Sequence, residues 1–95
     1  MSTKNDSSSK LTKLTSLLEQ IDPDVHYGDW IRALMVIFYE TGGSDDGFEL
    51  ADYWSSKGDK YKGTKDVRAR WRCFKPHIAN PVRMGTLVWM AGMTK

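Results

Sequence analysis

The side chains whose types and spacing could bind a ligand are cations in the second half of the chain. Four of them recur at helical spacing and share an arc of about 80° on a helix predicted over residues 65–75: Lys65, Arg68, Arg72 and Lys75. Arginine suits phosphate because its planar guanidinium can donate two hydrogen bonds to one group. A band of such cations binds a nucleic-acid backbone without reading its bases. The sequence therefore predicts a phosphate-binding surface made of Lys60, Lys62, Lys65, Arg68, Arg72, Lys75 and Arg83.

The distribution of charge leaves two interpretations of this band open. Residues 1–56 hold four Lys or Arg against ten Asp or Glu, a balance of −6. Residues 57–95 hold ten Lys or Arg against two Asp, a balance of +8. The second half could bind a polyanion. Alternatively, the two halves could pair with each other and leave a solvated helix face.

Tyr61 is the second candidate for ligand contact, because it lies between Lys60 and Lys62 in a basic loop. An exposed ring there could stack on a nucleobase, as rings do in single-strand binding proteins. The alternative is that Tyr61 folds back onto Trp54 or Trp71 as part of the core. We expect all four tryptophans to be core residues: Trp30, Trp54, Trp71 and Trp89.

No residue pattern indicates catalysis or a bound cofactor. His26 and His77 lack neighbouring cysteines or paired carboxylates at metal-ligand spacing. The aspartate pairs in 22–24 and 45–46 fall where helices should start, which favours a capping role. Cys73 has no positioned histidine to act as a base, so we expect it to be a buried small residue. We therefore predict no catalytic residue, no metal, no cofactor and no small-molecule ligand.

Length and composition indicate one domain. With 95 residues, of which 40% are hydrophobic, the chain can build one small core. A single cysteine excludes an internal disulfide, and no stretch approaches the roughly 20 apolar residues of a membrane span. The polar start of the chain lacks the apolar segment of a secretory signal. We expect a cytoplasmic protein with a flexible polar arm at 1–9 and one helical domain at 10–95.

Periodic apolar residues predict an all-α fold, a compact bundle of about five short helices. Leucines at steps of three and four predict a helix from Lys10 that stops before the Asp22-Pro23 bond. A second helix should span 28–41 and end at Gly42-Gly43 in a left-handed conformation.

Three further helices follow. Asp46 and Glu49 have the spacing of a capping box, which predicts a helix from there to Lys57 with Phe48, Ala51 and Trp54 buried. Thr64 is the expected N-cap of helix 65–75, which Pro76 should close. The last helix should start at Gly85-Thr86 and bury Leu87, Met90 and Ala91.

An ordered series of aromatic and glycine landmarks covers about two thirds of the chain. It consists of Tyr27-x-x-Trp30, Ala33-Leu34, Gly47-Phe48, Leu50, Trp54-Ser55, Lys60-Tyr61, Trp71-x-x-Phe74 and Gly85-Thr86-Leu87 leading to Ala91. Through this series the chain resembles the second family of primase C-terminal domains. Two departures stand out: the sequence starts at its own Met1 with a polar arm, so we expect either an excised domain or a free-standing subunit without a catalytic primase domain, and the segment 72–83 looks longer than the expected compact turn.

The resemblance implies a non-catalytic accessory module of mobile-element DNA replication. Such a module would hold single-stranded DNA, or an RNA primer or template, or couple to a primase, polymerase or helicase to support priming. Two alternatives stay open. One is a protein-interaction subunit that acts only by binding a replication enzyme, and the other is a phage-encoded inhibitor of a host protein.

Overall fold

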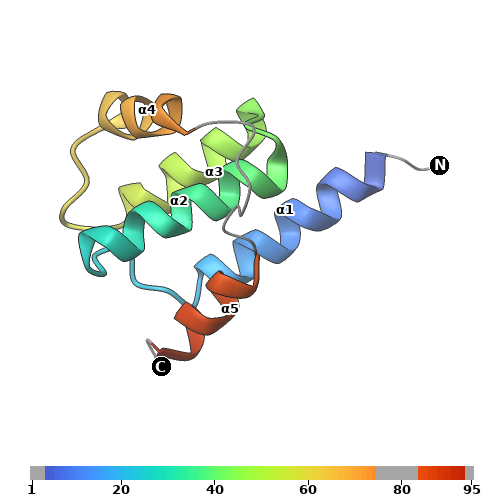
Figure 1. Cartoon of the computed structure of the whole chain (residues 1–95), viewed down its shortest axis with the longest axis horizontal. Coiled ribbons are helices and arrows are strands. Elements are labelled where there is room, and N and C mark those ends of the chain that lie inside the picture. The colour runs from blue at the N-terminus through green and yellow to red at the C-terminus, as the bar shows by residue number, and fades with distance from the viewer. Residues whose placement is uncertain (1–3, 75–83, 94–95) are drawn as a thin grey trace.

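The computed structural model describes residues 4–74 and 84–93, and every regular element in those ranges is an α-helix. This confirms the predicted all-α bundle. In chain order the helices are α1 (Lys4–Leu18), α2 (Tyr27–Thr41), α3 (Asp45–Ser56), α4 (Thr64–Cys73) and α5 (Met84–Met93) (Figure 1).

Helix α2 is the centre of the fold, since it packs against each of the other four helices. Its sequence allows this because apolar residues occupy most of its circumference: Ala33, Leu34, Val36, Ile37 and Phe38 are all buried. Helices α2 and α3 lie side by side (Figure 1). Helix α4 covers one side of this pair, and α1 and α5 pack on the other.

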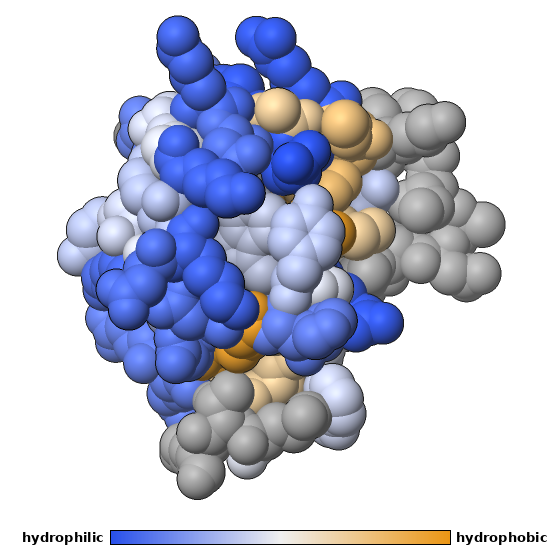
Figure 2. Space-filling view, turned by 90° about the vertical axis from the view of Figure 1, so that its left-hand side faces the viewer, coloured by the Kyte–Doolittle hydropathy of each residue, from blue (hydrophilic) through white to orange (hydrophobic). Residues whose placement is uncertain are grey.

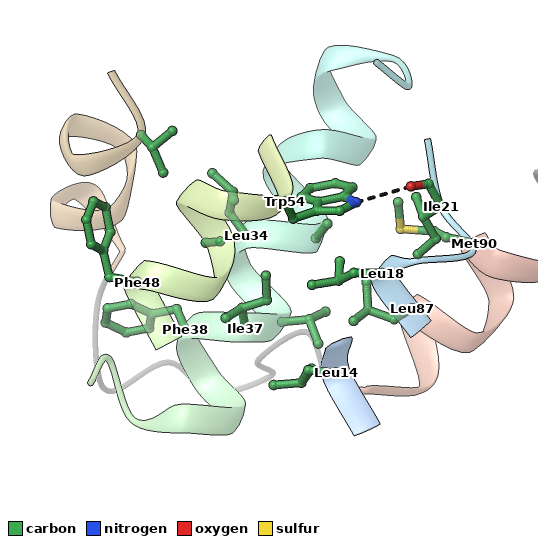
Figure 3. Packing of buried hydrophobic residues seen from close by; sticks show 14 of the residues in the cluster. Leu14, Leu18, Ile21, Leu34, Ile37, Phe38, Phe48, Trp54, Leu87 and Met90 are labelled. Atoms are coloured by element: carbon green, nitrogen blue, oxygen red, sulfur yellow. Dashed lines mark hydrogen bonds between the residues drawn. The ribbon is translucent and has the colours of Figure 1, made fainter. Parts of the chain in front are cut away.

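The core joins residues from all five helices (Figure 3). Leu14 and Leu18 of α1 are buried, as is Ile21 just after it, which confirms the predicted leucine face. The Trp54 indole of α3 donates a hydrogen bond of 3.1 Å to the carbonyl oxygen of Ile21. This bond satisfies a buried polar group and fixes α3 against the end of α1. Phe48 and Ala51 are buried on α3, and Leu87, Met90 and Ala91 on α5, again as predicted.

The turn between α2 and α3 was partly predicted. Gly42 and Gly43 are left-handed, with φ of 67° and 72°, and the Gly43 N–H donates to the carbonyl of Phe38 at 2.8 Å. The predicted N-cap of α3 was wrong, because Ser44 rather than Asp46 caps the helix, its hydroxyl accepting from the Gly47 N–H at 3.1 Å. Neighbouring Ser and Asp residues are both good caps, so spacing alone could not separate them.

The start of α4 also differs from the prediction. Gly63, with φ of 110°, precedes the helix, and Thr64 is its first residue rather than its N-cap. The Thr64 hydroxyl instead donates to Asp52 of α3 at 2.9 Å. Helix α4 ends at Cys73, and Phe74 is extended. The helix therefore ends two residues before the predicted end at Lys75, although Lys75 and Pro76 themselves lie outside the described residues.

Helix α1 begins at Lys4, six residues before the predicted start, so residues 4–9 of the expected flexible arm are helical. The leucine spacing marks only the part of a helix that is buried, and polar residues can extend a helix without any apolar marker. The division into an arm and a domain stays a prediction.

Two expectations about burial were wrong. Trp54 and Trp71 are buried and Trp30 is half-buried, but Trp89 is 59% exposed. Helix α5 has apolar residues on all sides, so its pattern could not show which face meets the core. Cys73 is exposed, because it follows Trp71 by two residues and points away from the side of α4 that packs on the core.

Candidate functional site

Aspartates of the acidic first half hold the loop between α3 and α4. The carboxylate of Asp24 accepts hydrogen bonds from the backbone N–H groups of Asp59 at 2.8 Å and Lys60 at 2.9 Å. These two bonds favour the ionised carboxylate and lower the pKa of Asp24. The loop backbone that carries Lys60 is therefore fixed by a residue 36 positions earlier in the chain.

Asp52 holds the next part of the loop through two hydroxyl groups. The Tyr61 hydroxyl donates to one of its oxygens at 2.8 Å, and the Thr64 hydroxyl donates to the other at 2.9 Å. The contact with the Thr64 hydroxyl lowers the pKa of Tyr61. The bond to Asp52 and desolvation raise this pKa, and together they outweigh Thr64, so the pKa of Tyr61 lies above its ordinary value. The ring is half-buried and packs against the core, so it combines features of both sequence interpretations.

A hollow of about 420 Å³ lies beside this loop, with aromatic rings in its wall. The rings of Tyr27 and Trp30, at the start of α2, lie 5.7 Å apart between centroids and tilt by 38°. The Trp30 indole donates to the Ser55 hydroxyl at 3.0 Å, and Tyr61 completes the wall. Figure 2 faces the side of the molecule with this loop and shows pale and apolar surface surrounded by hydrophilic side chains.

Helix α4 carries its cations on two flanks. At about 100° per residue, Lys65, Arg68 and Arg72 share one flank, and Arg70 lies nearly opposite. The Arg68 guanidinium lies 3.8 Å from the centre of the Phe48 ring. We call the flank with Lys65, Arg68 and Arg72 the outer side.

The other flank of α4 faces the hollow. Arg70 pairs with Asp66 at 3.5 Å, and both residues line the hollow. We call this region the hollow side, and its members of interest are Lys60, Lys62 and Arg70 with the rings of Tyr27, Trp30 and Tyr61.

Comparison with known protein families identifies the domain that carries these side chains. The family model described as Primase C terminal 2 (PriCT-2) matches residues 14–91. The chain belongs to the PriCT-2 family. Neither the curated proteins nor the solved structures contain a match to it. The match confirms the resemblance and identifies a primase-associated C-terminal module, which is accessory rather than catalytic.

The PriCT-2 match spans the whole candidate site, and the structure divides the predicted cation band between its two sides. Lys60 and Lys62 lie on the hollow side, and Lys65, Arg68 and Arg72 lie on the outer side. The remaining two members of the band, Lys75 and Arg83, are outside the described residues.

The cations of the predicted band differ from other cations of this chain in their ion pairing. Lys10 pairs with Glu40 at 3.7 Å, and Arg32 pairs with Asp29 at 2.8 Å. In residues 10–74 and 85–92, no carboxylate forms an ion pair with Lys60, Lys62, Lys65, Arg68 or Arg72. The acidic first half therefore uses Asp24 and Asp52 mainly to bind backbone and hydroxyl groups of the loop, and the charge of Lys60 contributes only the smallest of the effects that lower the pKa of Asp24.

Three residues of the site were missed by sequence reasoning: Tyr27, Trp30 and Arg70. Tyr27 was recognised only as a landmark of the family, and Trp30 as a landmark and an expected core residue. Their spacing of three residues on a helix was the available signal that they share one side. Asp66 and Arg70 have the four-residue spacing of a helical ion pair, which was also readable.

Two absences concern only the described part of the PriCT-2 module. It contains no group of three or more His, Cys, Asp or Glu side chains placed to hold a metal ion. None of its helices combines the length and apolar character needed to cross a membrane.

Proposed function

We propose that this PriCT-2 module binds single-stranded nucleic acid during mobile-element replication and so supports priming by a primase, polymerase or helicase. The observation that carries the proposal is the set of five cations in the loop and α4 that have no ion-pair partner among the described residues. In this proposal the assisted enzyme catalyses the priming reaction, and the module binds the strand.

Unpaired cations favour binding to phosphate for a simple electrostatic reason. No ion pair among the described residues has to break when phosphate arrives, and each contact releases counterions from the strand. On the outer side, Arg68 lies over the Phe48 ring, which restrains the guanidinium plane. A single strand suits the hollow side, since unstacked bases can reach aromatic rings.

Fluorescence anisotropy with a labelled oligothymidylate of about 16 nucleotides tests the proposal at low salt. We expect the wild type to bind, and Arg68→Ala with Arg72→Ala to weaken binding about tenfold. The matched control is Lys13→Ala with Arg32→Ala, which removes the same charge from α1 and α2 and should bind nearly as the wild type does. Absence of salt-sensitive binding by the wild type, or equal losses in the two double variants, would contradict the proposal.

A second candidate function is favoured by α5. Val88 and Trp89 are 57% and 59% exposed, and residues 84–93 contain no charged side chain. Large exposed apolar patches often mark protein contacts, and we propose the catalytic domain of a primase as the partner because the family is described as a primase C-terminal module. Calorimetric titration with a primase catalytic domain from the same source should show binding that Trp89→Ser abolishes. The equally exposed Tyr53→Ser is the control, and equal binding by the Trp89 variant would refute this contact.

A further inference from the structure

We infer that the hollow takes one nucleotide, with its base against the rings of Tyr27 and Trp30 and its phosphate at Lys60 and Lys62. The inference deepens the proposed function and rests on it. It assigns a defined place to one base and to the phosphate of the same nucleotide.

The size of the hollow and its lining suit a nucleotide. Its volume of about 420 Å³ falls within the roughly 300–1,000 Å³ of small-molecule sites. Such sites combine aromatic walls with a few polar groups, which is the combination found here. The rings of Tyr27, Trp30 and Tyr61 supply flat apolar surface, and lysines stand at its edge.

Two of the three rings are held in place before any ligand arrives. The hydrogen bond to Ser55 fixes Trp30, and the bond to Asp52 fixes Tyr61. Binding to fixed rings costs less conformational entropy than binding to mobile ones. Tyr27 is 58% exposed and lies against Trp30, so it presents an open ring surface to a base.

The charges around the hollow give the nucleotide an orientation. Asp59 and Asp66 line it, and their carboxylates repel a phosphate but accept hydrogen bonds from amino or imino groups of a base. Lys60 and Lys62 are exposed and attract the phosphate. The base therefore enters the hollow and the phosphate stays at the lysines.

Arg70 adds a donor that has no acceptor. Its Nε atom is buried without a hydrogen-bond partner in the described part of the chain, while its terminal nitrogen pairs with Asp66. A buried donor without an acceptor is unfavourable. A turn of the guanidinium toward an oxygen of a bound base would satisfy it.

The decisive experiment compares two strands of equal length, an oligothymidylate and a fully abasic strand, by anisotropy at several salt concentrations. We expect the wild type to bind the oligothymidylate more tightly. Tyr27→Ala should weaken its binding about five- to a hundredfold, with an unchanged salt slope, and should leave binding of the abasic strand as it is. The control Tyr53→Ala removes an equally exposed tyrosine that lies outside this hollow. It should change the affinity for neither the oligothymidylate nor the abasic strand.

A competition arm distinguishes a nucleotide within a strand from a free nucleotide. Thymidine monophosphate that displaces the strand from the wild type, but not from Tyr27→Ala, identifies a free nucleotide as a ligand. Failure to displace, with the Tyr27→Ala loss intact, assigns the site to the strand. Equal affinities of the wild type for both strands, with no effect of Tyr27→Ala, would overturn the inference.

The outcomes also separate the inference from the proposed function. Salt-sensitive binding of both strands with equal affinity overturns the hollow alone. No binding of either strand overturns the proposed function. If thymidine monophosphate also fails to bind, the inference that the hollow binds a nucleotide is contradicted as well.

Discussion

The two sides of α4 carry similar cations in different surroundings. On the outer side, Lys65 and Arg72 are exposed, and Arg68 lies over one ring. On the hollow side, lysines stand beside three rings in a loop that two aspartates hold. Under the proposed function, the outer side supplies only charge for phosphate, while the hollow side adds fixed aromatic walls for a base.

The buried stripe of α4 supports both sides at once. Val67 and Trp71 face the core between the two flanks, and Trp71 contacts Phe38 and Phe48 at centroid distances of 5.1 and 5.8 Å. The placement of every cation on this helix depends on that anchor.

The largest expected effect comes from removing this anchor. Trp71→Ala should lower the free energy of unfolding by about 3–5 kcal/mol, because it leaves a cavity between aromatic neighbours. Strand binding through both sides should fall with it, as urea denaturation and anisotropy on the same samples would show. The exposed Trp89→Ala should change stability by only about 0.5 kcal/mol. Similar losses in the two variants would contradict the proposed difference in their packing.

An intermediate effect should distinguish the two sides directly. Arg68→Ala with Arg72→Ala should weaken binding of oligothymidylate and abasic strands equally, about tenfold each, because the outer side contacts phosphate only. Lys60→Ala with Lys62→Ala should weaken binding of the oligothymidylate more, because these lysines hold the phosphate of the nucleotide whose base is in the hollow. If both double variants lost affinity for the two strands in the same proportion, the proposed difference between the outer side and the hollow side would be contradicted.

The smallest expected effect concerns the aspartate that holds the loop. Because the pKa of Asp24 is lowered from its ordinary value of 3.8, its ionised form stabilises the fold. This contribution is complete above the ordinary value and is lost as the pH falls through the lower value of the folded protein. Asp24→Asn should therefore lower the melting temperature by about a few degrees near neutral pH, and the gap to the wild type should narrow below pH 4 or so.

The matched control for this change is Glu19→Gln, an exposed carboxylate on the same half of the chain. It should melt close to the wild type throughout the pH range. A melting temperature of Asp24→Asn that tracks the wild type at neutral pH would mean that the two bonds to the loop do not stabilise it.

The helices and most of the core were predictable from the sequence because burial on a helix is periodic. The spacing of Leu14 and Leu18, or of Phe48 and Ala51, reports the buried face directly. Trp89 was not predictable in this way, since α5 is apolar on every side. The N-cap of α3 was missed because Ser44 and Asp46 are similarly favourable N-cap residues.

The candidate site was predictable in its cations but not in its shape. The hollow is assembled from four segments, around Tyr27, Ser55, Tyr61 and Arg70. Its loop is positioned by Asp24 across 35 and 36 residues of sequence. A pattern of residue types along one helix carries no information about such contacts, so the division of the cations into two sides emerges only from the tertiary structure.

The central claim is that unpaired cations of the loop and α4 bind the backbone of a single strand. The most direct test is the salt dependence of oligothymidylate binding by the wild type. Each phosphate contact contributes a slope of about −0.7 in a plot of log affinity against log salt. Contacts by all of Lys60, Lys62, Lys65, Arg68 and Arg72 predict a slope of about −3.5. A slope near zero, or no binding at low salt, would contradict the claim.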